Sequence, residues 1–136
     1  YDHVAADFIY PNGVHMSSYC RQYRGEGVAQ NVSEIIVGTK GRIDTIKPTR
    51  GANPYVQEHV DMMASILGTG PYINEAMAVA ESTMTCIMGR EAAYSGRRLT
   101  WDDMMKSQQD LLPKNLDINA SVPVPPVPVP GVYKFI

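Results

Sequence analysis

The chain has 136 residues, a formal net charge of −2 and a hydrophobic fraction of 44%. This length suits one domain with an ordinary core. The small negative charge gives no electrostatic reason to bind nucleic acid or an anionic membrane. No apolar run approaches the roughly 20 residues that a transmembrane helix needs. Cys20 and Cys86 lack metal or redox spacing, and we expect both to be buried free thiols.

The chain opens with a pattern typical of a β-hairpin over residues 4–21. Apolar residues recur with a period of two on both sides of Pro11-Asn12-Gly13. Asn-Gly is a strong hairpin signal because both residues tolerate positive φ. Because Tyr1 enters this pattern at once, we expect the chain to be a fragment of a longer protein.

A loop and a second hairpin are expected next. Residues 22–31 lose the alternation and contain two glycines. Residues 33–37 and 42–46 then flank the turn sequence Gly38-Thr39-Lys40-Gly41. Three or more antiparallel strands with one apolar face form an open sheet that needs a cover.

The helical half of the chain is predicted to supply that cover. Asn53 is a good N-cap before Pro54, and apolar residues then fall on one helical face as far as Gly68. A second helix is expected from Asn74 to a left-handed stop at Gly96. A capping box of Thr100 and Asp103 begins a short third helix.

The order of the elements indicates the fold class. Strands followed by helices predict an α+β fold, with an open, mainly antiparallel sheet packed on helices on one face. Residues 113–136 form an extended Pro-rich arm, because each proline fixes φ. We expect this arm to lie as a strap over its own domain or a neighbouring subunit, rather than to serve as an SH3-type ligand. Tyr133, Phe135 and Ile136 would anchor its end in apolar grooves.

Four residues are candidates for binding a substrate. Arg21, Tyr23 and Arg24 offer cationic and hydroxyl donors to an oxygen-rich ligand such as a sugar or its phosphate, or equally remain solvated loop residues. His59 lies near the start of the first helix and could donate or accept a hydrogen bond at neutral pH. It could face a pocket at the edge of the sheet, but we favour a hydrogen bond to a neighbouring loop.

We predict no cofactor cradle and no metal site. Gly25-Glu26-Gly27 supplies only half of the dinucleotide-binding G-x-G-x-x-G pattern and opens no helix. The Gly38–Gly41 segment lacks Walker spacing and is interpreted as a hairpin turn. His3 and His15 lie on the two strands of one hairpin and could approach each other, but nothing completes a ligand set with them.

Charged and methionine residues in the helical half are interpreted as structural. Arg90 and Glu91, beside Arg97 and Arg98, are expected to tie the helix end to its surroundings as exposed pairs, each worth at most about 1 kcal/mol. The helical spacing of the methionines favours core packing over an adaptable binding surface. These methionines are Met62, Met63, Met77, Met84, Met88, Met104 and Met105.

Three blocks of the sequence together resemble a known family. They are NPYVQEHVDMMASI, NEAMAVAESTMTCIMGREAAYSGRRLTW and PVPPVPVPGVYKFI. They resemble the C-terminal domain of the bacterial glucose-fructose oxidoreductase / inositol dehydrogenase family. The resemblance implies an N-terminal Rossmann domain that is missing here and that binds NAD or NADP in the full-length parent. It also implies a C-terminal sheet whose free face forms the subunit interface.

The same resemblance implies hydride transfer to or from a sugar, polyol or related alcohol. The Glu-Lys-Pro segment of the family has no match here, because Ile46 precedes Lys47-Pro48. No catalytic, cofactor-binding or metal-binding residue is therefore carried over to this chain.

We accordingly expect a substrate-side and oligomerisation domain, inactive without its Rossmann domain. Its partners would be that domain, a sugar-like small molecule and a second copy bound through the sheet face, with neither nucleic acid nor membrane. Two alternatives stay open: a stand-alone dimerising interaction module, and part of an NAD-dependent glycosidase of the same family. The sequence does not distinguish a cytoplasmic from an exported bacterial protein.

Overall fold

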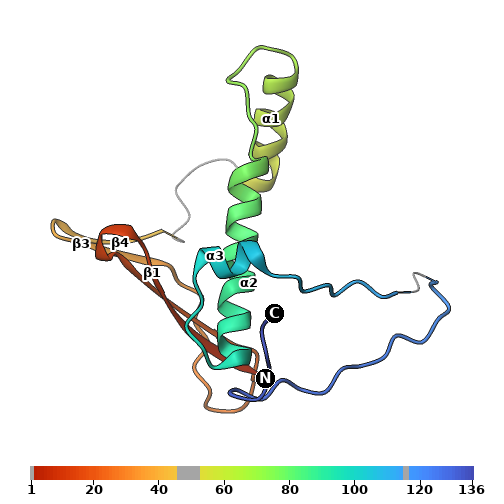
Figure 1. Cartoon of the computed structure of the whole chain (residues 1–136). Coiled ribbons are helices and arrows are strands. Elements are labelled where there is room, and N and C mark those ends of the chain that lie inside the picture. Colours follow the sequence, from red (N-terminus) through yellow and green to blue (C-terminus); the bar gives the residue numbers. More distant parts are fainter. Residues whose placement is uncertain (1, 46–52, 115–116) are drawn as a thin grey trace. The chain divides into compact units, whose positions relative to one another are not determined.

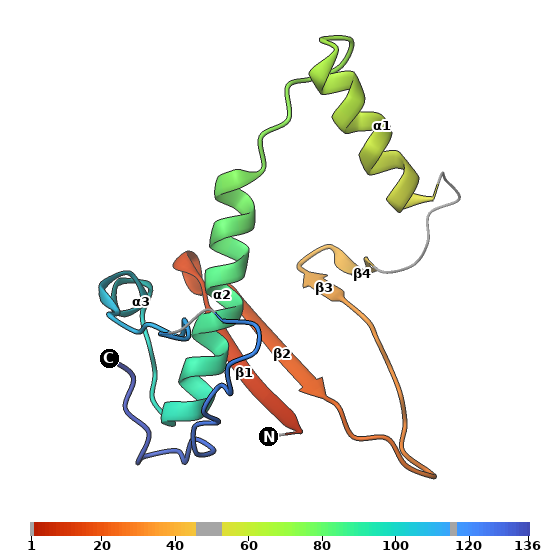
Figure 2. The same ribbon diagram turned by 90° about the vertical axis from the view of Figure 1, so that its right-hand side faces the viewer.

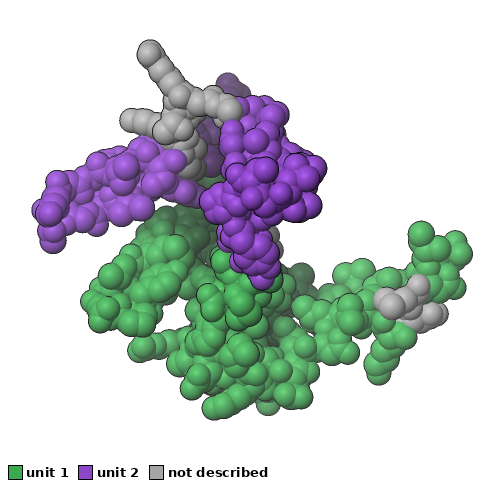
Figure 3. Space-filling model, turned by 90° about the horizontal axis from the view of Figure 1, so that it is seen from above, with its two compact units in different colours: residues 1–23, 76–136 green, residues 24–75 purple. Residues whose placement is uncertain are grey.

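The computed structural model describes residues 2–45, 53–114 and 117–136 (Figure 1). The predictions made for Ile46 and for Lys47-Pro48 lie outside these residues. The chain forms two compact units (Figure 3). Unit 1 comprises residues 1–23 and 76–136, and unit 2 comprises Arg24–Glu75.

The α+β class is confirmed. In the described residues, four strands precede three α-helices along the chain. The strands are divided into two antiparallel two-stranded sheets, β1-β2 in unit 1 and β3-β4 in unit 2, and are not joined in one sheet. None of the helices in the described part of the chain has the length and apolar character needed to cross a bilayer.

Unit 1 begins with the predicted hairpin. Strands β1 (His3–Ile9) and β2 (His15–Arg21) are joined by the short turn Pro11–Gly13. Asn12 and Gly13 have φ values of 70° and 73°, the left-handed conformation that these two residue types tolerate best. The turn chemistry therefore identifies the hairpin correctly.

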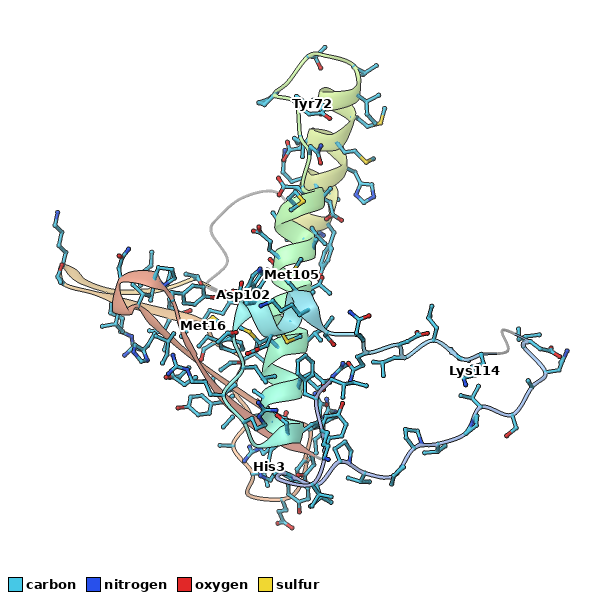
Figure 4. The ribbon with its side chains drawn as sticks, viewed as in Figure 1. His3, Met16, Tyr72, Asp102, Met105 and Lys114 are labelled. Atoms are coloured by element: carbon cyan, nitrogen blue, oxygen red, sulfur yellow. The ribbon has the colours of Figure 1, made fainter. Side chains whose placement is uncertain are left out.

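The expected approach of His3 to His15 is wrong. The register pairs His3 with Arg21 and His15 with Ile9, so the two histidines occupy opposite ends of the hairpin. Six residues of strand separate these ends, which corresponds to roughly 20 Å. Figure 4 labels His3 at one end and Met16, which follows His15, towards the other.

The helices of unit 1 begin and end at local signals in the sequence. Helix α2 (Ala76–Ser95) ends before Gly96, whose φ is 66°. Helix α3 (Trp101–Lys106) begins with the predicted capping box, in which Thr100 and Asp103 each bond the other's backbone N–H. The end of α2 and the start of α3 are thus explained by backbone groups at helix termini that need local partners.

The interior of unit 1 lies around α2. Strand β1 lies beside this helix (Figure 2), with Val4, Ala6 and Phe8 half-buried on one face. Met104 of α3 is 5% exposed. Gly89, Glu91 and Ser95 are the buried residues of α2. The core is therefore built partly from glycine and polar side chains.

Burial corrects two predictions. Met104 packs inside and Met84 and Met88 are half-buried, but core packing is wrong for the other methionines, which are exposed: Met62, Met63, Met77 and Met105. The cysteines Cys20 and Cys86 are free but exposed, so the expected burial is also wrong. Helical spacing identifies a face, and only the elements packed around that face decide whether it is buried.

Unit 2 contains the second hairpin and one helix. Strands β3 (Ile35–Gly38) and β4 (Gly41–Asp44) pair as predicted. Helix α1 (Pro54–Ile66) begins at Asn53, whose side chain accepts a hydrogen bond from the Tyr55 N–H at 3.0 Å. The helix contains no buried residue in the structure, so its apolar face lacks the expected cover.

Candidate functional site

Unit 1 contains a groove of about 740 Å³, which we call the β1 groove. Ligand sites commonly have volumes of about 300–1,000 Å³. The lining residues come from β1 and the turn after it, from one face of α2, and from the segment that joins α2 to α3. They are Ala5–Pro11, Thr85, Met88, Gly89, Ala92, Ala93 and Arg97–Trp101.

Small residues on α2 create the space for this groove. Gly89, Ala92 and Ala93 present little or no side chain towards it. A Cβ atom added at Gly89 would lie 2.8 Å from Cζ of Phe8, which is closer than side-chain carbons approach. The glycine therefore allows the Phe8 ring to lie directly against the helix backbone.

Polar and aromatic side chains frame the groove. Arg97 and Arg98 are exposed, and neither forms an ion pair with the described residues. Trp101, the single tryptophan of the chain, is 39% exposed. Asp7 instead accepts hydrogen bonds from His15 Nδ1 (2.8 Å) and from Ser17 Oγ (3.3 Å) on β2. The groove thus offers two cations and an aromatic ring beside an apolar floor.

A buried carboxylate lies outside the groove, on α2. The side chain of Glu91 is 1% exposed, and its Oε1 accepts a hydrogen bond from Arg90 Nε at 2.9 Å and forms an ion pair with Arg90 Nη2 at 2.8 Å. Its Oε2 accepts from the Tyr133 hydroxyl at 2.8 Å and lies 3.4 Å from Nε2 of Gln109. The pair was expected to be exposed, which is wrong for Glu91, whereas the Arg90 side chain is 38% exposed. A buried carboxylate needs such partners because burying an unpaired charge is costly.

These contacts hold the end of the Pro-rich arm on unit 1. Gly131 N–H donates to the Ser95 carbonyl at 3.0 Å, and the Tyr133 ring meets Tyr94 edge to face at 6.0 Å. The Ile136 carbonyl accepts from Ser107 Oγ. The arm therefore ends as a strap over its own unit. Its anchors are mainly polar, because the Ile136 side chain is exposed.

The Tyr133 hydroxyl has a distinctive environment as a result. Burial, followed by its hydrogen bond to the Glu91 carboxylate, raises the pKa of Tyr133 above its usual value. The ionised phenolate would be poorly solvated and would face a carboxylate. No sequence pattern links residues 91 and 133, so this cluster was missed.

The four residues predicted to bind substrate are divided between the units. Arg21 ends β2 and Tyr23 closes the first segment of unit 1, whereas Arg24 and His59 belong to unit 2. The structure does not join them into one site. Their role in binding stays a prediction.

His59 has a well-defined local partner. Its Nδ1 lies 2.7 Å from the Tyr55 carbonyl oxygen, one turn earlier in α1. A carbonyl only accepts, so Nδ1 carries the proton and the exposed Nε2 is the acceptor of the neutral ring. The expected partner in a neighbouring loop is wrong, and the actual partner is the backbone of the same helix.

The glycine turn at residues 25–27 does not have the geometry of a dinucleotide cradle. Gly25-Glu26-Gly27 forms a tight turn that is closed by a 3.2 Å bond from Val28 N–H to the Gly25 carbonyl. The next helix among the described residues begins only at Pro54, whereas a pyrophosphate cradle requires the glycines to open a helix. Within the described ranges, no three His, Cys, Asp or Glu side chains gather as metal ligands.

Comparison of the chain with protein-family models, with curated proteins and with solved structures gave no match.

Proposed function

We propose that this chain is the substrate-side and oligomerisation domain of a sugar- or polyol-related NAD(P)-dependent oxidoreductase. The resemblance of its three sequence blocks supports this proposal. In it, NAD or NADP is held by a separate Rossmann domain, consistent with the absence of a G-x-G-x-x-G pattern from this sequence. The chain contributes a wall of the site and an association surface.

The half-covered hairpin of unit 1 is the observation that carries the proposal. Val4, Ala6 and Phe8 lie on the face of β1 that is half-buried, whereas every residue of β2 is exposed. On the opposite face, Tyr19 is 80% exposed across from Ala5. An exposed aromatic side chain on an uncovered sheet face favours association with a second copy, because burying it removes apolar area from water.

For the substrate, the proposal assigns Arg21, Tyr23, Arg24 and His59 as donors and acceptors towards hydroxyl groups. Arginine and tyrosine are suited to binding oxygen-rich ligands. The unoccupied Nε2 of His59 could accept one further hydrogen bond from a hydroxyl. These assignments rest on residue type, and an alanine variant at each position tests them by calorimetry with the full-length parent and a polyol.

The association surface can be tested directly by sedimentation. At tens of micromolar we expect the chain to self-associate, and Tyr19→Lys to shift it to the monomer. The control is Tyr72→Lys, which changes an equally exposed tyrosine of unit 2. A monomeric unmodified chain, or equal effects of the two variants, would contradict the proposal.

Cofactor binding tests the division of labour between the two domains. We expect the isolated chain to leave NADH fluorescence unchanged, because its sequence contains no G-x-G-x-x-G pattern. Micromolar binding of NADH to this chain would refute the proposal.

The exposed Tyr19 face also suits the second candidate, a stand-alone dimerising module. The two are distinguished by the parent gene, since an upstream G-x-G-x-x-G fingerprint would exclude the module. Chromogenic glycosides offered to the full-length protein would separate the glycosidase alternative from net NADH production.

A further inference from the structure

We propose that the β1 groove binds an extended polypeptide segment, which adds to the free edge of β1 as a third strand and places an acidic side chain at Arg97 and Arg98. This inference does not depend on the proposed function, because it concerns the edge of the hairpin and not its exposed face.

The hydrogen-bond pattern of the hairpin identifies the free edge. Gln22 N–H donates to the Asp2 carbonyl at 2.7 Å, and Tyr10 N–H donates to the Val14 carbonyl at 2.8 Å. In an antiparallel pair, bonded and non-bonded residue pairs alternate. The even-numbered residues of β1 therefore bond to β2, and its odd-numbered residues direct their N–H and C=O groups away from β2.

Three of these outward-facing residues line the groove: Ala5, Asp7 and Ile9. Their outward backbone groups have no hydrogen-bond partner among the described residues. Residues Ala6 and Phe8 from the other face line the groove as well. A cavity that contacts both faces of one strand, and no residue of its partner strand, lies along the strand's free edge.

The remaining walls suit an added strand. Gly89, Ala92 and Ala93 form a floor of small residues. Strand β1 forms one wall of the groove, and the segment from Arg97 to Trp101 forms another. Neighbouring strands lie about 4.8 Å apart, and alternate side chains of an added strand would point to the floor and to solvent. This combination of a sheet edge and a helix is a recurring geometry for recognising extended peptides.

The charge of the groove selects the peptide. Arg97 and Arg98 are exposed without an ion pair in the described part of the chain. Asp7 is already engaged by His15 and Ser17. An incoming carboxylate therefore finds two guanidinium groups without an ion pair, although the charge of Arg97 also acts on the Asp103 carboxylate. The occupant is an extended segment with alternating apolar residues and an acidic residue.

The probe for this inference is a fluorescein-labelled synthetic peptide of alternating valine and threonine that ends in two glutamates. Anisotropy on titration with the whole chain measures binding, and Trp101 fluorescence reports entry into the groove. We expect saturable binding at micromolar chain concentration. The absence of binding up to millimolar concentration would overturn the inference.

Two substitutions locate the binding surface. Ala5→Pro removes one outward N–H but no bond to β2, and proline is tolerated where an edge N–H faces outward. We expect it to weaken binding about five- to tenfold, the effect of losing one hydrogen bond. The control Val37→Pro removes a backbone N–H from β3, a strand of the other unit's hairpin, and should leave the affinity unchanged. Equal effects would overturn the assignment to the β1 edge.

A charge exchange gives a test whose expected result cannot be produced by unfolding of the chain. Arg98→Glu should weaken binding of the glutamate peptide and strengthen binding of the same peptide ending in two lysines. If both peptides respond alike, the acidic preference is refuted. If Ala5→Pro abolishes self-association in sedimentation, a second copy occupies the groove and the peptide assignment is wrong.

Discussion

The contact between Gly89 and Phe8 leads to a quantitative prediction. In Gly89→Ala, the new Cβ would lie 2.8 Å from Cζ of Phe8 and 3.6 Å from its Cε1. A comfortable carbon–carbon contact is about 3.5–4.0 Å, so the ring must move by more than half of an ångström or the helix must shift. Both responses disturb the packing of β1 on α2.

Two opposing effects determine the net change in stability. Replacing glycine by alanine inside a helix normally stabilises the helix by about 1 kcal/mol. Overpacking a close contact costs about 1–3 kcal/mol. Since the aromatic ring is rigid, we take a cost of about 2 kcal/mol and expect Gly89→Ala to destabilise unit 1 by about 1 kcal/mol.

Urea unfolding followed by Trp101 fluorescence measures this change, because the tryptophan belongs to unit 1. A double-mutant cycle isolates the steric contribution. In a Phe8→Leu background the terminal ring atoms are gone, so Gly89→Ala should stabilise by about 1 kcal/mol. Ser82→Ala, at an exposed position of the same helix, is a control remote from Phe8 that changes helix propensity and removes one hydrogen bond to the Ala78 carbonyl.

A coupling energy of about 2 kcal/mol between the two sites is therefore expected. If Gly89→Ala raises stability equally in both backgrounds, the close approach of Phe8 to α2 is wrong. The β1 groove would then have a different floor.

Three further predictions concern the strap and the caps. Glu91→Ala should lower the unfolding free energy of unit 1 by about 2–3 kcal/mol, because it leaves charged and hydroxyl donors unpaired. The control Glu81→Ala, at an exposed site, should change it by less than about 0.5 kcal/mol. Urea unfolding measures both variants. The pKa of Tyr133 in the folded state is raised by burial and by Glu91. Its contribution to the free energy of unfolding is therefore fully present below the usual pKa of 10.0 and is lost as pH rises through the folded-state pKa. An alkaline series of unfolding midpoints should show this loss, and Tyr133→Phe should remove it. The pKa of Asp103 is lowered by its hydrogen bonds from Thr100. Its contribution to the free energy of unfolding is therefore fully present above pH 3.8 and is lost as pH falls through the folded-state pKa. If Asp103→Asn leaves the dependence of the unfolding midpoint on acidic pH unchanged, this prediction is contradicted.

The parts of the fold that were predicted correctly depend on residues close together in the chain. The Asn12-Gly13 turn, the Asn53 cap, the stop at Gly96 and the capping box of Thr100 with Asp103 each involve backbone groups within a few positions. Such groups must find a local partner or adopt a special conformation wherever the rest of the chain goes. Residue type alone therefore specifies them.

The candidate sites depended instead on distant packing. The sequence analysis assigned no role to Gly89, and only its contact with Phe8 shows why it lacks a side chain. The buried state of Glu91 depends on Tyr133, which lies 42 residues further along. The free edge of β1 likewise follows from the absence, among the described residues, of a third strand in its sheet.

By itself, the sequence determined the hairpins, the helix boundaries and the α+β class, because turn chemistry, capping and periodicity act over one or two turns of backbone. Tertiary structure alone decided which apolar faces were covered, that the strands formed two separate sheets, and where the strap was anchored. These outcomes depend on the balance between burial and chain entropy across the whole molecule, and no segment of the chain carries that balance alone.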